Sequence, residues 1–366
     1  MAAASAEKIK LLILTPSLGC GGSEKYVSLL CNHIDTEKFT VTLAVLNNEN
    51  PFFTINNKAV QVIDMQVKHA RRSLHKLRRL VKELQPDILL STSNHLNVLL
   101  AFARWMFPKQ LVMIARESSL VSLNRKRVKF PIVYEWLVKQ FYRRFDTIIC
   151  QSKFMQTDLI SNYNIEREKT VIINNPVESH ELIVDIPQYN KFVTVARLSQ
   201  EKGIARLIRS VAHLKMPFRF HIIGDGNKKQ DLATLITSLQ LQDKVFLEGE
   251  KKEPFAGMEN AALFLMGSYF EGFPNSLLEA AALGIPAVAF DAPGGISEIL
   301  IDGKNGLLVK DGDERAFAFA IEKAVSMTFN RQHIKTAALE KFALPVIMKQ
   351  AENLFIRLYQ QSKKHS

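Results

Sequence analysis

Short apolar runs alternate with amphipathic stretches along almost the whole chain. Apolar runs of four to eight residues predict strands, and stretches with apolar residues at every third or fourth position, such as 24–33 and 71–84, predict helices. In the first half the predicted strands are 10–15, 39–46, 60–64, 87–91, 110–115, 147–150 and 170–173. In the second half they are 192–196, 218–223, 244–247, 262–266 and 287–290, with 306–309 as an edge strand. Strands that are apolar throughout, each followed by a helix, are typical of parallel sheets covered on both faces.

The alternation breaks once, near residues 174–190, where Asn-Asn-Pro, scattered acidic residues and a second proline show no period. A chain of 366 residues also exceeds what one hydrophobic core usually serves. We therefore predict an α/β protein with a Rossmann-like domain at 1–175 and a second at 190–330. C-terminal helices at 331–366 are expected to pack back towards the first domain.

Two glutamates, Glu271 and Glu279, follow the predicted strand 262–266. Open α/β sheets bind ligands at the carboxyl ends of their strands. The intervening Pro274-Asn-Ser can begin a helix, whose N-terminus favours an anion such as a diphosphate. Glu279, one turn inside that helix, could then accept the hydroxyls of a ribose, and Glu271 could face a sugar. A loop acid and an exposed helix acid without a function explain the pair alone equally well.

Two cations follow the predicted strand 192–196 in the same way. Arg197 ends the strand, and Lys202 lies at the start of the next helix. Both could stabilise charge that develops on a leaving diphosphate, as a divalent metal does in other enzymes. In isolation a surface arginine and a solvated lysine would be the simpler interpretation. Neither a metal nor a cofactor is expected, and Asp311-Gly-Asp313 predicts a turn and a helix cap.

Glycines follow several strands. Gly21 and Gly22 come after the first strand and could let a phosphate or sugar approach the backbone, although a tight strand-to-helix turn needs the same residues. The dinucleotide fingerprint is incomplete, because Glu24 stands where its third glycine belongs. This disfavours a nicotinamide-dependent oxidoreductase. Gly224 and Gly249 end two later strands.

Taken together, these segments resemble the large retaining glycosyltransferase family 4, which has the GT-B fold. The motifs that carry the resemblance, in chain order, are 18–24, 195–203, 223–226, 271–279 and 293–298. The combination of Arg-x4-Lys with Glu-x7-Glu is specific, and each motif by itself is weak. The resemblance spans nearly the whole chain and implies two Rossmann-like domains that face each other across a cleft.

The resemblance also implies roles for residues. Arg197 and Lys202 would bind the diphosphate, Glu279 the ribose, and Glu271 would act with the two cations in catalysis. The wider nucleotide-sugar site would add Gly21, Gly22, Gly224, Gly249, Phe273, Pro274, Asn275 and Ser276. UDP is the commoner donor nucleotide in the family.

The opposite wall, for the acceptor or the sugar, is expected from His95, Arg116 and Glu117, which follow two first-half strands. His95 could equally be a helix-start residue. Family members often carry a histidine where this chain has Arg116-Glu117, so contacts to the donor sugar are open there.

The charge is unevenly distributed. Lys and Arg number 48 against 36 Asp and Glu, a net charge of +12. Residues 66–144 hold 17 basic and 4 acidic residues, so this segment has a charge of +13 and the remainder −1. Such asymmetry suggests an anionic partner. The residues expected to bind a membrane surface are Arg71, Arg72, Lys76, Arg78, Arg79, Arg125, Lys126 and Arg127.

These observations predict a metal-independent, retaining glycosyltransferase of bacterial envelope or polysaccharide synthesis. It would move a hexosyl or N-acetylhexosaminyl unit from a nucleotide-sugar, with UDP favoured, to a glycan or lipid-linked acceptor. Three scattered cysteines indicate a reducing compartment, and the basic segment indicates a peripheral place on the cytoplasmic face of the inner membrane. The alternatives are a nucleotide-sugar epimerase or hydrolase and, from another class, a nucleic-acid-binding protein, although no nucleic-acid-binding motif accompanies the basic segment.

Overall fold

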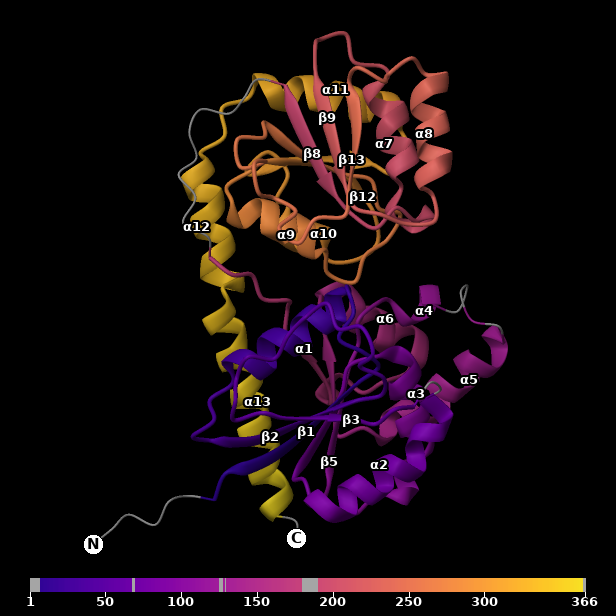
Figure 1. Ribbon diagram of the computed structural model, residues 1–366, viewed down its shortest axis with the longest axis vertical. Coiled ribbons are helices and arrows are strands. Elements are labelled where there is room, and N and C mark those ends of the chain that lie inside the picture. The colour runs from indigo at the N-terminus through magenta and orange to yellow at the C-terminus, as the bar shows by residue number, and fades with distance from the viewer. Residues whose placement is uncertain (1–6, 68–69, 125–127, 129, 180–189, 365–366) are drawn as a thin grey trace, which may run out of the picture. The chain divides into compact units, whose positions relative to one another are not determined.

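The computed structural model describes residues 7–67, 70–124, 128, 130–179 and 190–364. It divides into two compact units, Met1–Pro176 with Leu344–Ser366, and Val177–Ala343. Each unit contains one parallel sheet with helices packed on it (Figure 1). The prediction of two Rossmann-like, α/β units is confirmed.

The first unit has a seven-stranded sheet of order β3-β2-β1-β4-β5-β6-β7. Its strands are β1 (Ile9–Thr15), β2 (Phe39–Val45), β3 (Gln61–Asp64), β4 (Ile88–Ser91), β5 (Val112–Arg116), β6 (Thr147–Cys150) and β7 (Thr170–Ile172). Its helices are α1 (Gly22–His33), α2 (Ala70–Leu84), α3 (Asn94–Phe102), α4 (Val121–Asn124), α5 (Pro131–Phe141), α6 (Lys153–Tyr163) and α13 (Leu344–Lys364), with the 3₁₀ turns η1 (Arg104–Met106), η3 (Tyr142–Arg144) and η4 (Arg167–Lys169).

The second unit has a six-stranded sheet of order β10-β9-β8-β11-β12-β13. Its strands are β8 (Lys191–Val195), β9 (Arg219–Ile223), β10 (Val245–Gly249), β11 (Leu263–Met266), β12 (Ala287–Asp291) and β13 (Gly306–Lys310). Its helices are α7 (Ile204–Val211), α8 (Lys229–Ser238), α9 (Asn275–Ala282), α10 (Ile296–Ile299), α11 (Glu314–Ser326) and α12 (Arg331–Phe342), with the 3₁₀ turn η5 (Gln200–Lys202).

The predicted strands all form, with bounds within two residues of those expected. The central positions of the inner strands are buried because both faces of each sheet are covered there, which is why these strands are apolar throughout, whereas the edge strand β3 is largely exposed. Since every strand pair in a sheet is parallel, the carboxyl ends of all its strands meet at one edge. Residues that follow different strands are thereby brought together.

The C-terminal segment divides between the units. Helix α12 packs on α9 in the second unit, whereas the long helix α13 lies against the first sheet (Figure 1). One apolar face of α13 enters the first unit's core, where Phe355 meets Phe39 edge-to-face with ring centroids 6.1 Å apart. Apolar spacing along α13 produces this face.

Candidate active site

The centre of the candidate site is a loop that follows β11 in the second unit. Glu271 lies in this loop with its side chain only 11% exposed. Its Oε1 accepts two hydrogen bonds of 2.6 Å, one from Lys202 Nζ and one from Ser268 Oγ. The backbone N–H of Glu271 donates to Pro293 O at 2.9 Å. The carboxylate is therefore held in one orientation beside a cation.

Lys202 and Glu271 are 69 residues apart in sequence, and strand order brings them together. Lys202 ends η5 after β8, Glu271 follows β11, and β8 pairs with β11 in the sheet. The loops that carry this pair approach each other closely at Gly203 and Gly267, which explains why both positions are glycine. A Cβ on Gly203, whose φ is +60°, would lie 1.8 Å from Gly267 O. Any side chain there would separate the two loops.

Arg206 on α7 supports the same loop from below and was not singled out in the sequence. Its buried guanidinium lies between the rings of Tyr269 and Phe290, with Cζ 4.0 Å from each centroid. Nε donates to Gly267 O at 2.6 Å, Nη2 donates to Ser268 O, and Nη1 pairs with Asp311. A buried arginine that bonds two consecutive carbonyls fixes their peptide units. Ser268 was also missed, although a hydroxyl three residues before Glu271 in a loop after a strand was a usable signal.

The other residues of the predicted donor site lie at the same sheet edge. Arg197 follows β8 and is exposed. Gly224 follows β9, and its N–H donates to Gly249 O at the end of β10 at 2.8 Å. A Cβ on Gly224 would lie 2.0 Å from Ala196 O, so the approach of two loops explains this glycine. Asp313 caps α11 by accepting from Ala316 N at 2.8 Å, which confirms its predicted role.

Helix α9 begins where the sequence predicts, with Pro274 at its N-cap. Asn275 and Ser276 are half-exposed in its first turn, and Glu279 is half-exposed one turn further on. Phe273 turns inward and meets Phe342 of α12 with ring centroids 5.4 Å apart. Its side chain therefore anchors the start of α9 in the core of the second unit.

In the first unit, Gly21 and Gly22 follow β1 and His95 follows β4, so they lie at the carboxyl edge of that sheet. Gly22 begins α1 after β1, and the hydroxyl of the adjoining Ser23 donates to Thr92 O at 2.6 Å. Gly21 is its N-cap, in an extended conformation with φ −148°. His95 is exposed on the first turn of α3.

Arg116 and Glu117, at the end of β5, are wholly buried. The Arg116 guanidinium stacks on Tyr26 with Cζ 3.6 Å from the ring centroid, and Nη2 donates to Asn175. Glu117 Oε1 accepts from Asn97 Nδ2 at 2.7 Å and from Tyr142 OH at 2.8 Å. Both side chains are thus enclosed by interior groups of the first unit.

Burial dominates the electrostatics of this pair. Removal from water raises the pKa of Glu117 to about 7, against the partial opposition of the hydrogen bonds from Asn97 and Tyr142. Burial also lowers the pKa of Arg116 to about 10, although the neighbouring Tyr26 and Glu117 favour its charged form. Glu117 thus titrates near neutral pH inside the first unit.

The basic helix α2 buries its apolar stripe, with Leu77 and Val81 in the interior. Arg78, Arg79 and Lys82 are exposed, and so is Lys76, whose Nζ donates to Met65 O at 2.7 Å. The side chains of Arg71 and Arg72, and all of 125–127, lie outside the described residues.

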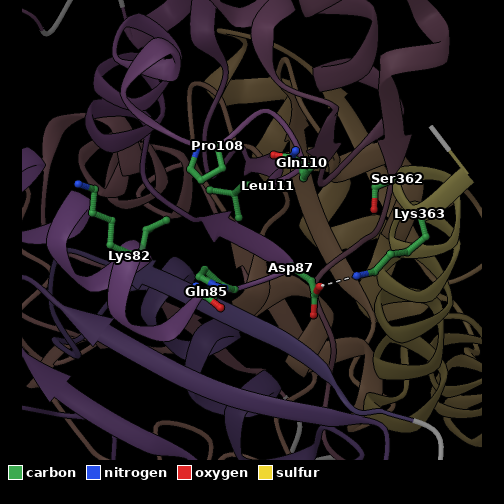
Figure 2. Close-up of a pocket in the computed structure, with 10 residues that line it drawn as sticks. Lys82, Gln85, Asp87, Pro108, Gln110, Leu111, Ser362 and Lys363 are labelled. Carbon is green, nitrogen blue, oxygen red and sulfur yellow. Dashed lines mark ion pairs between the residues drawn. The ribbon is translucent and has the colours of Figure 1, made fainter. Parts of the chain in front are cut away.

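A pocket of about 450 Å³ lies at the opposite edge of the first sheet. Asp87 and Leu111, which precede β4 and β5, line it together with Lys363 near the end of α13 (Figure 2). Asp87 faces Lys363 there, with 3.7 Å between Oδ1 and Nζ. The pocket is therefore separate from the carboxyl edge, where the predicted chemistry lies.

Within the described part of the chain, no cluster of three His, Cys, Asp or Glu side chains could hold a metal ion. In the same part, no helix combines the length and the apolar character needed to cross a membrane.

Family models match both halves of the chain. Residues 20–181 match the model described as glycosyltransferase family 4, and residues 182–341 the model described as glycosyl transferases group 1. The chain is 30% identical over 322 residues to the N-acetylgalactosamine-N,N'-diacetylbacillosaminyl-diphospho-undecaprenol 4-alpha-N-acetylgalactosaminyltransferase of Campylobacter jejuni, covering 84% of this chain and 87% of that protein. It is 23% identical over 344 residues to the amylovoran biosynthesis glycosyltransferase of Erwinia amylovora, covering 91% and 95%.

Solved structures agree on the fold. The apo lipopolysaccharide outer core galactosyltransferase has a TM-score of 0.79 at 21% identity, over 95% of this chain and 99% of that chain. The Anabaena HepE protein in complex with UDP and glucose has a TM-score of 0.77 at 21% identity, over 94% and 99%. The class so defined is a glycosyltransferase with the GT-B fold. The chain belongs to glycosyltransferase family 4.

Proposed function

We propose that this glycosyltransferase moves a hexosyl or N-acetylhexosaminyl unit from a UDP-sugar, with retention of configuration, in bacterial glycan synthesis. The observation that carries the proposal is the Lys202–Glu271 pair at the carboxyl edge of the second sheet. It combines a fixed carboxylate with a cation in the loops where α/β sheets bind nucleotides. The alpha-galactosaminyl-transferring Campylobacter relative and the UDP complex of the Anabaena protein support the reaction class and the donor.

The second unit would hold the donor. An ammonium group has three N–H donors, so Lys202 can keep its bond to Glu271 while donating to a phosphate oxygen. Arg197, Lys202 and the start of α9 would stabilise the departing diphosphate, and Glu279 would accept the ribose hydroxyls. The bond from the anomeric carbon to the diphosphate breaks, and the acceptor oxygen forms its bond on the same face. The acceptor's proton goes to the leaving phosphate.

The acceptor would be lipid-linked and would enter over the first unit. The name of the Campylobacter relative includes diphospho-undecaprenol, which supports an acceptor on a polyprenyl diphosphate. The exposed cations Arg78, Arg79 and Lys82 of α2 support attachment to the anionic cytoplasmic face of the inner membrane. His95, exposed on α3, is the wall residue best placed to meet an acceptor, whereas Arg116 and Glu117 would act by holding the edge in shape.

The test is a transfer assay with UDP-, GDP- and ADP-sugars and a polyprenyl-diphosphate-linked saccharide, with and without EDTA. We expect UDP release that depends on the acceptor, a product of retained configuration by NMR, and full activity in EDTA. A donor in hundredfold excess over its Kd should also stabilise the protein by about 2.7 kcal/mol.

Different results would contradict the transferase reaction and the metal-independent mechanism. UDP release at the same rate without acceptor would indicate a hydrolase. Loss of activity in EDTA, restored by Mg²⁺ or Mn²⁺, would contradict the account based on Arg197 and Lys202.

A further inference from the structure

Large apolar side chains are exposed together on one part of the first unit. Trp105 in η1 is 73% exposed, and Phe102 at the end of α3 is 47% exposed. On α5, Ile132 is 82% and Trp136 is 55% exposed, while Tyr134 and Val138 on the same helix are buried. Helix α5 is therefore apolar on its inner and outer faces. Its outer face and η1 flank α3, which contacts both elements, and Figure 1 shows α5 at the periphery of this unit.

Ring contacts join Phe102 and Trp136 through the half-exposed Phe141. Phe141 meets Phe102 at 5.3 Å and Trp136 at 5.6 Å between ring centroids, both edge-to-face. Arg144 covers Phe141, with Cζ 4.4 Å from the centroid, and its Nη1 donates to Phe102 O at 3.2 Å. The residues of this aromatic patch are Phe102, Trp105, Ile132, Val133, Trp136 and Phe141. Contiguous exposed apolar surfaces of this kind mark interaction sites.

Cations lie close to the patch along the chain. The exposed basic side chains within a few residues of its members are Lys109, Lys139, Arg143 and Arg144, and Arg144 contacts the patch directly. Glu135 pairs with Lys139 at 3.4 Å, and Asp146 is exposed nearby. Helix α3, which carries Phe102, also contacts α2, and it is α2 that has the basic outer face. Tryptophan side chains beside lysines and arginines suit the interface of an anionic bilayer, where rings enter the headgroup region and cations meet lipid phosphates.

We propose that the aromatic patch inserts into the interfacial layer of an anionic membrane while the surrounding cations and α2 bind headgroups. This deepens, and rests on, the membrane location in the proposed function. It replaces a mainly electrostatic attachment by one with an apolar component. Salt screens the electrostatic part, with a Debye length of about 10 Å at about 0.1 M and about 3 Å at about 1 M, but leaves apolar insertion in place.

The chain offers an internal reporter, because it has two tryptophans and both, Trp105 and Trp136, belong to the patch. The experiment adds vesicles of phosphatidylglycerol and phosphatidylcholine to the full chain and records tryptophan emission, quenching by brominated lipids, and sedimentation. We expect a blue shift and quenching with anionic vesicles, and a bound fraction that persists at about 1 M salt.

Three variants separate the contributions. Trp105→Ser with Trp136→Ser should lower partitioning at high salt about 10-fold. Arg78→Ser with Arg79→Ser and Lys82→Ser should weaken binding at low salt only. Phe319→Ser, at a 68% exposed position on α11 of the second unit, is the matched control and should bind as wild type.

The outcomes are distinct. Sedimentation with anionic vesicles without a blue shift or quenching would overturn insertion and leave the membrane location standing. No sedimentation with any vesicle would overturn both. Unchanged vesicle binding of the tryptophan variant, with a changed oligomeric state on size-exclusion chromatography, would show that the patch binds protein instead.

Discussion

The carboxyl edges of the two sheets carry the same kinds of polar residue in opposite situations. After β11, the Glu271 side chain keeps 11% of its surface exposed, and its carboxylate is fixed by Lys202 and Ser268. After β5, Glu117 is wholly buried and accepts hydrogen bonds from two interior side chains. Both glutamates follow a buried strand. Glu271 lies in the loop at the sheet edge, whereas Glu117 is enclosed in the interior of its unit. Position after a strand thus predicts proximity to a site, and burial decides whether a side chain can touch a ligand.

The largest expected effect comes from Glu271, whose carboxylate lies in the loop after β11. Glu271→Gln should reduce kcat about 10²- to 10³-fold, because the carboxylate that we propose faces the sugar loses its charge. UDP affinity should be unchanged. Glu279→Ala should instead raise the KM for the donor, since the ribose would lose the acceptor that we propose for its hydroxyls. Steady-state kinetics and calorimetry with UDP measure both, and near-normal turnover of the Glu271 variant would refute its role.

A smaller effect is expected when the support of Glu271 is removed. Ser268→Ala deletes one of two hydrogen bonds to Oε1, and a bond to a charged group contributes roughly 1.5–3 kcal/mol. We expect kcat to fall about 10-fold with little change in donor KM, and Ser268→Thr, which keeps a hydroxyl, to recover most of it.

Ser210→Ala is the matched control for this variant. Ser210 is buried in the same unit and donates to a helix carbonyl, Arg206 O, at 2.8 Å. If both alanine variants lose activity equally, or if a crystal structure of the Ser268 variant keeps Glu271 in place, Ser268 has no positioning role.

The smallest effect concerns the buried glutamate and appears in stability. Because the folded-state pKa of Glu117 is about 7 and its usual pKa is 4.5, the folded chain holds a proton that the unfolded chain has released between these pH values. The free energy of unfolding therefore falls as pH rises through this window, by at most about 3 kcal/mol. Glu117→Gln cannot ionise and should remove this slope, which leaves the variant the more stable protein at pH above 7.

Denaturant unfolding of wild type and Glu117→Gln across the pH range measures this difference. Asp146, an exposed carboxylate before β6 at the opposite edge of the same sheet, provides the control variant Asp146→Asn, which should keep the wild-type slope. Parallel curves for wild type and Glu117→Gln would show that Glu117 is not the group responsible.

Much of the architecture could be predicted from the sequence because it depends on local patterns. Apolar runs specified all the strands of both sheets, and Pro274 with the polar residues after it specified the start of α9. The sequence also placed Arg197, Lys202 and Glu271 correctly, each after the end of a strand. These features need only information from neighbouring residues in the chain.

The contacts within the site could not be predicted in this way. Spacing does not reveal that β8 lies beside β11, so the Lys202–Glu271 bond and the support from Ser268 were not foreseen. Arg206 resembles an ordinary helical residue in the sequence, because its partners come from the loop after β11, from β12 and from the turn after β13.

The sequence by itself therefore determined the strands, the helices, the family and the set of polar residues near the sheet edges. Tertiary structure alone decided which of those residues are paired, which are exposed and which are buried. The physical reason is that a side chain's free energy depends on its desolvation and its partners, and both are set by segments distant in the chain. Arg116 shows this most plainly, since Tyr26 and Asn175, far from it in sequence, enclose it in the interior.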